Sequence, residues 1–129
     1  MKKQLIMPGK DTTAGPYSPG LTLGDMVFVS GQAAVNPDTG EIVPGTIEEQ
    51  TEMTLSNIQR ILEAGGAAMD DCVKVTVYLR DMADFQRMNV IYRKFFSKPY
   101  ATRTTVQAVL YPGLEIEIDA IAVRGSGKK

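Results

Sequence analysis

The chain has 129 residues, of which 43% are hydrophobic and 22% are charged, and these values fit one globular domain over residues 1–129. The formal net charge is −1 with the basic residues scattered, and no apolar run approaches the ~20 residues of a membrane span, so we expect neither a nucleic-acid nor a membrane partner. Histidine is absent and Cys72 is the single cysteine, which excludes imidazole general-base catalysis, a zinc site and an intramolecular disulfide.

The first part of the chain predicts three strands and then a helix. Within residues 21–30, the Gly24-Asp25 pair marks a tight turn between two strands, and the Asn36-Pro37-Asp38-Thr39-Gly40 cluster predicts a loop. Thr46 and Glu49 have the spacing of a capping box, which starts a helix. Its buried stripe recurs every three to four residues, at Ile47, Thr51, Leu55, Ile58 and Leu62. Gly65-Gly66 then ends the helix.

The second part predicts a strand, a helix and two further strands. Residues 73–79 alternate between apolar and polar side chains, as in a strand with one buried face. Asp81 is placed to cap a helix that carries Phe85, Met88, Tyr92 and Phe95 on one side and stops before Pro99. Strands are then expected over 102–110 and 115–123, separated by the Pro112-Gly113 turn, and 125–129 reads as a flexible tail.

This order of elements predicts an α+β fold with a six-stranded mixed sheet and two helices on one face. The other face must then meet solvent or protein. By strand parity, that face carries Tyr78, Val109, Ile121 and Val123. Because these side chains are largely apolar, we expect a partner chain to cover them.

Arg103 is the residue whose role the pattern leaves open. It shares a strand face with Thr105 and Gln107, and parity also puts Glu115, Glu117 and Asp119 on one face of the next strand. One interpretation is a solvated charge ladder in which Arg103 pairs with a neighbouring carboxylate. The other is a clamp for a substrate carboxylate, since a guanidinium offers two parallel donors and Arg103 directly follows a loop. A cation site on the three acids is disfavoured because alternate strand residues are roughly 7 Å apart.

Several motifs together resemble the RidA (YjgF-like) family of reactive-intermediate deaminases, nearly end to end and in the same order. These motifs are Gly15-Pro16-Tyr17-Ser18, Val29-Ser30-Gly31-Gln32, Asn36-Pro37-Asp38-Thr39-Gly40, Phe85-x-x-x-Asn89-x-x-Tyr92, Arg103-Thr104-Thr105-Val106, and Ile116-Glu117-Ile118-Asp119-Ala120-Ile121-Ala122-Val123. The resemblance implies a chorismate-mutase-like fold and a homotrimer with clefts between subunits. It also implies hydrolysis of enamine and imine acids, such as 2-aminoacrylate, 2-iminopropanoate and 2-iminobutanoate, to 2-keto acids and ammonia. We expect no cofactor or metal, and because a single cysteine suits a reducing compartment, we expect a cytoplasmic protein.

The same resemblance implies roles for individual residues. Arg103 would bind the substrate carboxylate beside the backbone N–H of Thr105, and Glu117 would position or activate the attacking water. Tyr17 would line the lid. The remaining expected contacts with the substrate come from Ser30, Gly31, Phe85 and Asn89.

One segment departs from the family pattern, and two other functions compete with the deaminase. The stretch Leu110-Tyr111-Pro112-Gly113-Leu114 is about one residue shorter than in the family, which puts the orientation of Glu117 and the size of the substrate in question. One alternative is a regulatory module that binds a small metabolite in the same clefts without turnover. The other is an endoribonuclease, which the absence of histidine and of a basic stripe disfavours.

Overall fold

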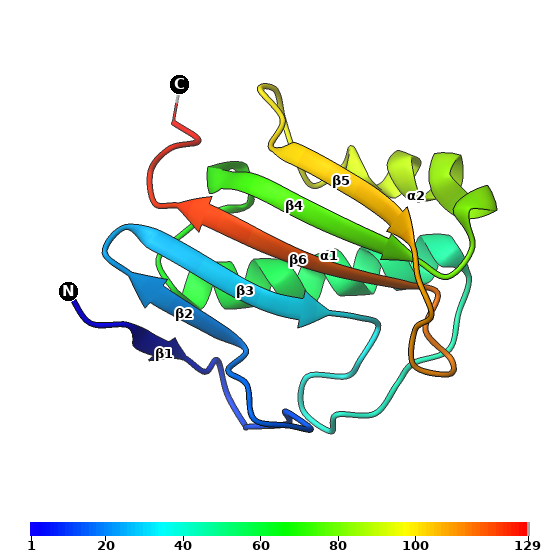
Figure 1. The fold of residues 1–129 in the computed structure, drawn as a ribbon, viewed down its shortest axis with the longest axis horizontal. Helices are drawn as coiled ribbons and strands as arrows, with labels where there is room; N and C mark the ends of the chain where they lie inside the picture. The colour runs from blue at the N-terminus through cyan, green and yellow to red at the C-terminus, as the bar shows by residue number, and fades with distance from the viewer. Residues whose placement is uncertain (129) are drawn as a thin grey trace.

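The computed structural model describes residues 1–128, which form six strands, two α-helices and two short 3-10 turns. The order is β1 (Gln4–Ile6), β2 (Gly20–Leu23), β3 (Met26–Gln32), α1 (Ile47–Ala64), η1 (Met69–Asp71), β4 (Cys72–Leu79), η2 (Met82–Asp84), α2 (Phe85–Tyr92), β5 (Thr102–Gln107) and β6 (Ile116–Val123). The six strands form one sheet in the order β1-β2-β3-β6-β4-β5 (Figure 1). Only the β4–β5 pair is parallel, so the sheet is mixed as predicted.

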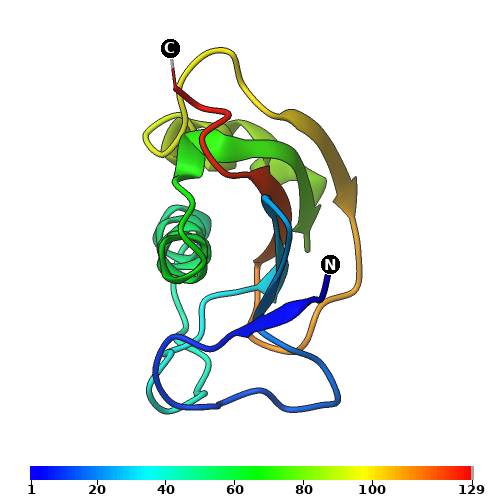
Figure 2. The ribbon, with the colours of Figure 1, turned by 90° about the vertical axis from the view of Figure 1, so that its left-hand side faces the viewer.

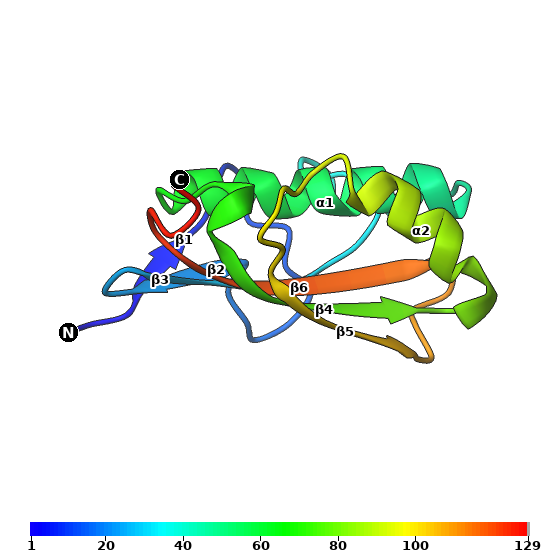
Figure 3. The ribbon, with the colours of Figure 1, turned by 90° about the horizontal axis from the view of Figure 1, so that it is seen from above.

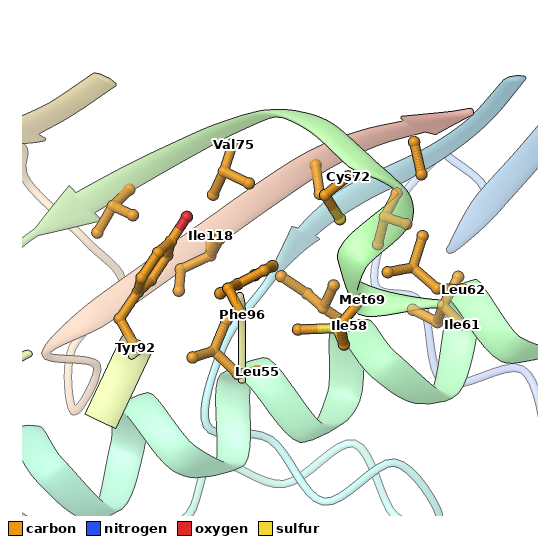
Figure 4. Close-up of a cluster of buried hydrophobic side chains, with 14 of the residues drawn as sticks. Leu55, Ile58, Ile61, Leu62, Met69, Cys72, Val75, Tyr92, Phe96 and Ile118 are labelled. Atoms are coloured by element: carbon orange, nitrogen blue, oxygen red, sulfur yellow. The ribbon is translucent and has the colours of Figure 1, made fainter. Parts of the chain in front are cut away.

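Both helices pack on one face of this sheet and leave the other face bare (Figures 2 and 3). The core between the layers combines the α1 stripe with inward-facing strand residues; Figure 4 shows Leu55 and Ile58 of α1 below Val75 and Ile118 of the sheet. We call the uncovered side the outer face. Strand parity and pairing put Tyr78, Ile121 and Val123 there, as predicted. No helix among residues 1–128 is long and apolar enough to cross a membrane.

The capping box at the start of α1 is confirmed by both of its hydrogen bonds. The Glu49 N–H donates to Thr46 Oγ1 over 3.2 Å, and the Thr46 N–H donates to Glu49 Oε1 over 2.9 Å. Asp81 caps as expected too, by accepting from the Ala83 N–H, but it caps the short η2 turn that leads into α2. The second helix is shorter than predicted, since α2 ends at Tyr92 and Phe95 lies beyond it.

The strand predicted over 102–110 is also too long, because β5 ends at Gln107. The physical reason is that β5 is an edge strand whose one neighbour, β4, ends at Leu79, the residue paired with Gln107. Val109 therefore lies in a loop, fully exposed, and not on the outer face of a strand. Near the C-terminus, the Gly127 N–H donates to the buried Asp71 carboxylate over 2.8 Å, while Lys129 lies outside the described residues.

Candidate functional site

Arg103 lies on the helix-facing side of β5, stacked against two aromatic rings of α2. It pairs with Val75, which is fully buried beneath the helices, and paired residues of adjacent strands share a face. The guanidinium carbon is 4.6 Å from the centroid of the Tyr92 ring and 5.5 Å from that of Phe85. Stacking of this kind orients a guanidinium through its flat face. Its N–H groups lie in the plane of the group, so they remain available to a ligand.

The space around Arg103 is a pocket of about 220 Å³ without an acidic residue in its wall. Its lining consists of Asn89, Tyr92, Arg93, Tyr100, Ala101 and Arg103. Within residues 1–128, both ion pairs involve Arg87, so Arg103 has no carboxylate partner. Burial raises the pKa of Tyr92 to about 12 against the opposing effect of Arg103, and this side chain therefore stays a neutral phenol. The pocket thus presents positive charge and hydrogen-bond donors, which suit an anion.

The interpretation of Arg103 as part of a charge ladder is wrong. Strand β4 lies between β5 and β6, so Arg103 is not next to any carboxylate of β6. Moreover, Glu117 pairs with Tyr78 on the outer face, whereas Arg103 faces the helices. The two residues therefore point to opposite sides of the sheet, and one chain cannot bring both to the same small ligand.

Glu117 lies against Gly31 at a bulge in β3. Between Val29 and Gln32, β3 advances three residues while β6 advances two, from Ala120 to Ile118, and this extra residue turns Gly31 towards the carboxylate. A Cβ atom at Gly31 would overlap Glu117 Oε2 and lie 3.0 Å from its Cδ, so only glycine leaves this space free. Burial raises the pKa of the Glu117 carboxyl, and the nearby Asp119 raises it further. Glu117 is thus a half-buried carboxylate with a strengthened affinity for protons.

The loop that carries Tyr17 is fastened to the same end of β3. Ser30 Oγ donates to the Ser18 carbonyl over 2.6 Å, and the Ser30 N–H donates to the Pro19 carbonyl over 3.0 Å. Tyr17 itself is 52% exposed and lines a cavity of about 540 Å³ together with Gly31 and Glu117. In this chain Ser30 uses its hydroxyl to hold the loop in position.

The predicted site residues therefore form two separate groups. The Arg103 group consists of Arg103, Phe85 and Asn89, with Thr105 two residues further along the same face of β5. The Glu117 group consists of Glu117, Gly31, Tyr17 and the supporting Ser30. Each group is an incomplete site: one can bind an anion, and the other can accept a proton.

The family model described as Endoribonuclease L-PSP matches residues 9–124. The chain belongs to this family, the RidA (YjgF) family. It is 41% identical to the 2-iminobutanoate/2-iminopropanoate deaminase of Escherichia coli strain K12, over 96% of this chain and 99% of that protein. The crystal structure of E. coli TdcF with bound serine superposes with a TM-score of 0.82 at 37% identity, covering 95% and 99% of the two chains. The YjgF gene product of E. coli gives 0.83 at 37% identity, covering 94% and 98%.

Two residues of this RidA-family chain that support the site were not assigned a role from the sequence. Tyr92 is the closer of the two rings on Arg103, and its helical spacing from Phe85 and Asn89 could have indicated that all three face one strand. Gln50 is a polar residue within the buried part of α1, 2% exposed. Such burial of an amide signals that it has hydrogen-bond partners.

Gln50 holds the turn that precedes β6. Its Nε2 donates to the Gly113 carbonyl over 2.9 Å and to the Val43 carbonyl over 3.1 Å. Its Oε1 accepts from the Glu115 N–H over 2.7 Å. Because Glu115 is two residues before Glu117, Gln50 fixes the start of the strand that presents this carboxylate. In this RidA-family chain the turn is therefore anchored to α1.

Proposed function

We propose that the protein hydrolyses imines and enamines of small 2-amino acids, such as 2-aminoacrylate, 2-iminopropanoate and 2-iminobutanoate, to 2-keto acids and ammonia. The observation that carries this proposal is the stacked Arg103 guanidinium, which lines a pocket with no carboxylate partner within residues 1–128. A bidentate guanidinium suits the carboxylate of such a substrate. Two relatives support the proposal: the 41% identical deaminase, and TdcF, whose structure contains serine.

We further propose that each active site combines the Arg103 group of one copy with the Glu117 group of another. The opposite orientations of Arg103 and Glu117 require this if both act on one substrate. A second copy also explains the outer face, where the half-buried Phe28, Ile121 and Val123 have no helix above them. We take the number of copies to be three, as the family resemblance implies, and a homotrimer would have three equivalent clefts.

The chemistry required at such a cleft is modest. The carbon of a protonated imine is already electrophilic, so the protein has to orient the acid and supply one water molecule. Arg103 holds the carboxylate, and Glu117 accepts a proton from the water as its oxygen adds to the imine carbon. The same proton then passes to the nitrogen, and Glu117 accepts the hydroxyl proton as ammonia leaves and the carbonyl forms. A raised pKa makes Glu117 a better proton acceptor than an exposed carboxylate.

The direct test is the release of 2-keto acid from imines that a threonine dehydratase produces in situ from serine or threonine. We expect the protein to accelerate release, and Arg103→Ala to abolish this acceleration. Arg80→Ala is a matched control, because Arg80 is an exposed arginine that lies outside both groups. No acceleration, with calorimetric binding of 2-keto acids intact, would instead favour the regulatory module.

The shared site is tested by combining two inactive variants. Co-expression of Arg103→Ala and Glu117→Ala chains should restore part of the activity, since mixed trimers contain clefts with an intact Arg103 from one chain and an intact Glu117 from the other. A site within one chain would regain nothing on mixing.

A further inference from the structure

A second arginine lines the same pocket as Arg103. Arg93 directly follows α2, and its N–H donates to the Asn89 carbonyl over 3.0 Å, so it lies one helical turn beyond Asn89. Both residues contribute to the wall of the 220 Å³ pocket, as does Arg103 of β5. Arg93 therefore belongs to the surroundings of the ligand and not only to the helix surface.

Two arginines line the pocket, the exposed Arg93 and the partly buried Arg103. Its other lining residues are Asn89, Tyr92, Tyr100 and Ala101, none of which is acidic. Both ion pairs in residues 1–128 are formed by Arg87, and neither Arg93 nor Arg103 has a carboxylate partner. Two like charges in one small pocket repel each other, and a ligand with two negative groups relieves that repulsion.

We propose that this site selects imino acids that carry a second carboxylate on the side chain, with Arg103 binding the 2-carboxylate and Arg93 the distal one. The inference rests on the proposed function, of which it specifies the substrate class. A pocket of 220 Å³ is smaller than the roughly 300–1,000 Å³ of drug-sized sites, which fits a short dicarboxylic acid. Asn89 is buried and also lines the pocket, and it adds an uncharged hydrogen-bonding group.

The test compares selectivity in wild type, Arg93→Gln, Arg93→Lys and Lys94→Gln. Amino-acid oxidases generate the imines of glutamate and alanine in situ, and semicarbazide trapping follows their loss. The quantity measured is kcat/KM for the dicarboxylic imine divided by kcat/KM for the monocarboxylic one. Lys94→Gln removes the same charge from the adjacent exposed residue, which does not line the pocket, and therefore controls for net charge.

We expect Arg93→Gln to lower this ratio by about tenfold, the effect of losing one partly solvated charge-assisted hydrogen bond. Arg93→Lys should retain part of the preference, and Lys94→Gln should leave the ratio unchanged. An unchanged ratio in Arg93→Gln, or an equal fall in Lys94→Gln, would overturn the inference.

A binding measurement decides the inference even if no imine is hydrolysed. Calorimetry with 2-oxoglutarate and 2-oxobutyrate gives the ratio of the two dissociation constants without turnover. A preference for the dicarboxylic keto acid that Arg93→Gln reduces by about tenfold supports the pocket assignment. Absence of turnover together with that preference would refute the deaminase activity and still support the role of Arg93. Turnover without any preference would support the deaminase activity and refute the role of Arg93.

Discussion

Gly31→Ala should separate catalysis from folding, because the added methyl group meets only the end of a flexible side chain. Its Cβ atom would overlap Glu117 Oε2 and approach Cδ to 3.0 Å, whereas ordinary contacts between carbon atoms begin near ~3.5 Å. The backbone of Gly31 does not have a positive φ, so alanine is not strained there. The carboxylate must therefore move, and the backbone need not.

The expected size of the effect follows from this displacement. Restoring an ordinary contact moves the Glu117 carboxylate by about 1 Å, and a misplacement of this size costs on the order of 10²-fold in rate. The free energy of unfolding should change by less than about 1 kcal/mol, because the side chain rotates away and alanine also restricts the unfolded chain. The assays are keto-acid release from in situ generated imine and urea denaturation of the same preparations.

A double-mutant cycle shows whether the loss passes through Glu117. If Gly31→Ala acts by displacing this carboxylate, then adding it to Glu117→Ala should reduce the residual activity no further. Additive losses in the cycle would refute the positional argument, as would full activity in Gly31→Ala alone. A loss of stability above about 2 kcal/mol would show that the backbone had moved instead.

Three further predictions concern charge, turn anchoring and thiol reactivity. The native pKa of Glu117 lies above its unfolded value near 4.5, so its contribution to the free energy of unfolding falls as the pH rises from that value through the native pKa. The stability of Glu117→Gln minus that of wild type, measured by urea unfolding, should therefore be greater at pH 7 than at pH 4. An equal stability difference at both pH values would contradict burial of the charge. Gln50→Leu removes three hydrogen bonds to partly buried backbone groups and should cost about 2–4 kcal/mol, whereas Gln59→Leu on the same helix should cost little. Equal midpoints in denaturation would refute the anchor. Burial, with Asp71 and Asp70 nearby, raises the pKa of Cys72 to about 12. Ellman's reagent at pH 8 should therefore label this thiol only after unfolding. Rapid labelling of the native protein would show that the thiol is accessible.

Most of the fold could be predicted from local signals, because those signals match the forces that hold it. The capping box at Thr46 marks the start of α1, and the α1 stripe and the alternation in β4 and β6 each indicate one buried face. The extent of β5 could not be predicted in this way. Its sequence continues to favour a strand up to Leu110, and the strand stops at Gln107 because its partner β4 stops, which is a property of the tertiary pairing.

The same distinction explains why the sequence left open which site residues one chain brings together. Glu117 lies between Ile116 and Ile118, so its orientation away from the core follows from the sequence. Arg103 lies between Thr102 and Thr104, which do not indicate a buried side, and its face is set by the parallel pairing with β4. Local pattern therefore predicts each half of the site but not their relative orientation. That orientation changes what a variant can show. Under the proposed shared site, Arg103 and Glu117 variants of one chain would affect different clefts, so recovery of activity on mixing is a stronger test than the loss caused by either one.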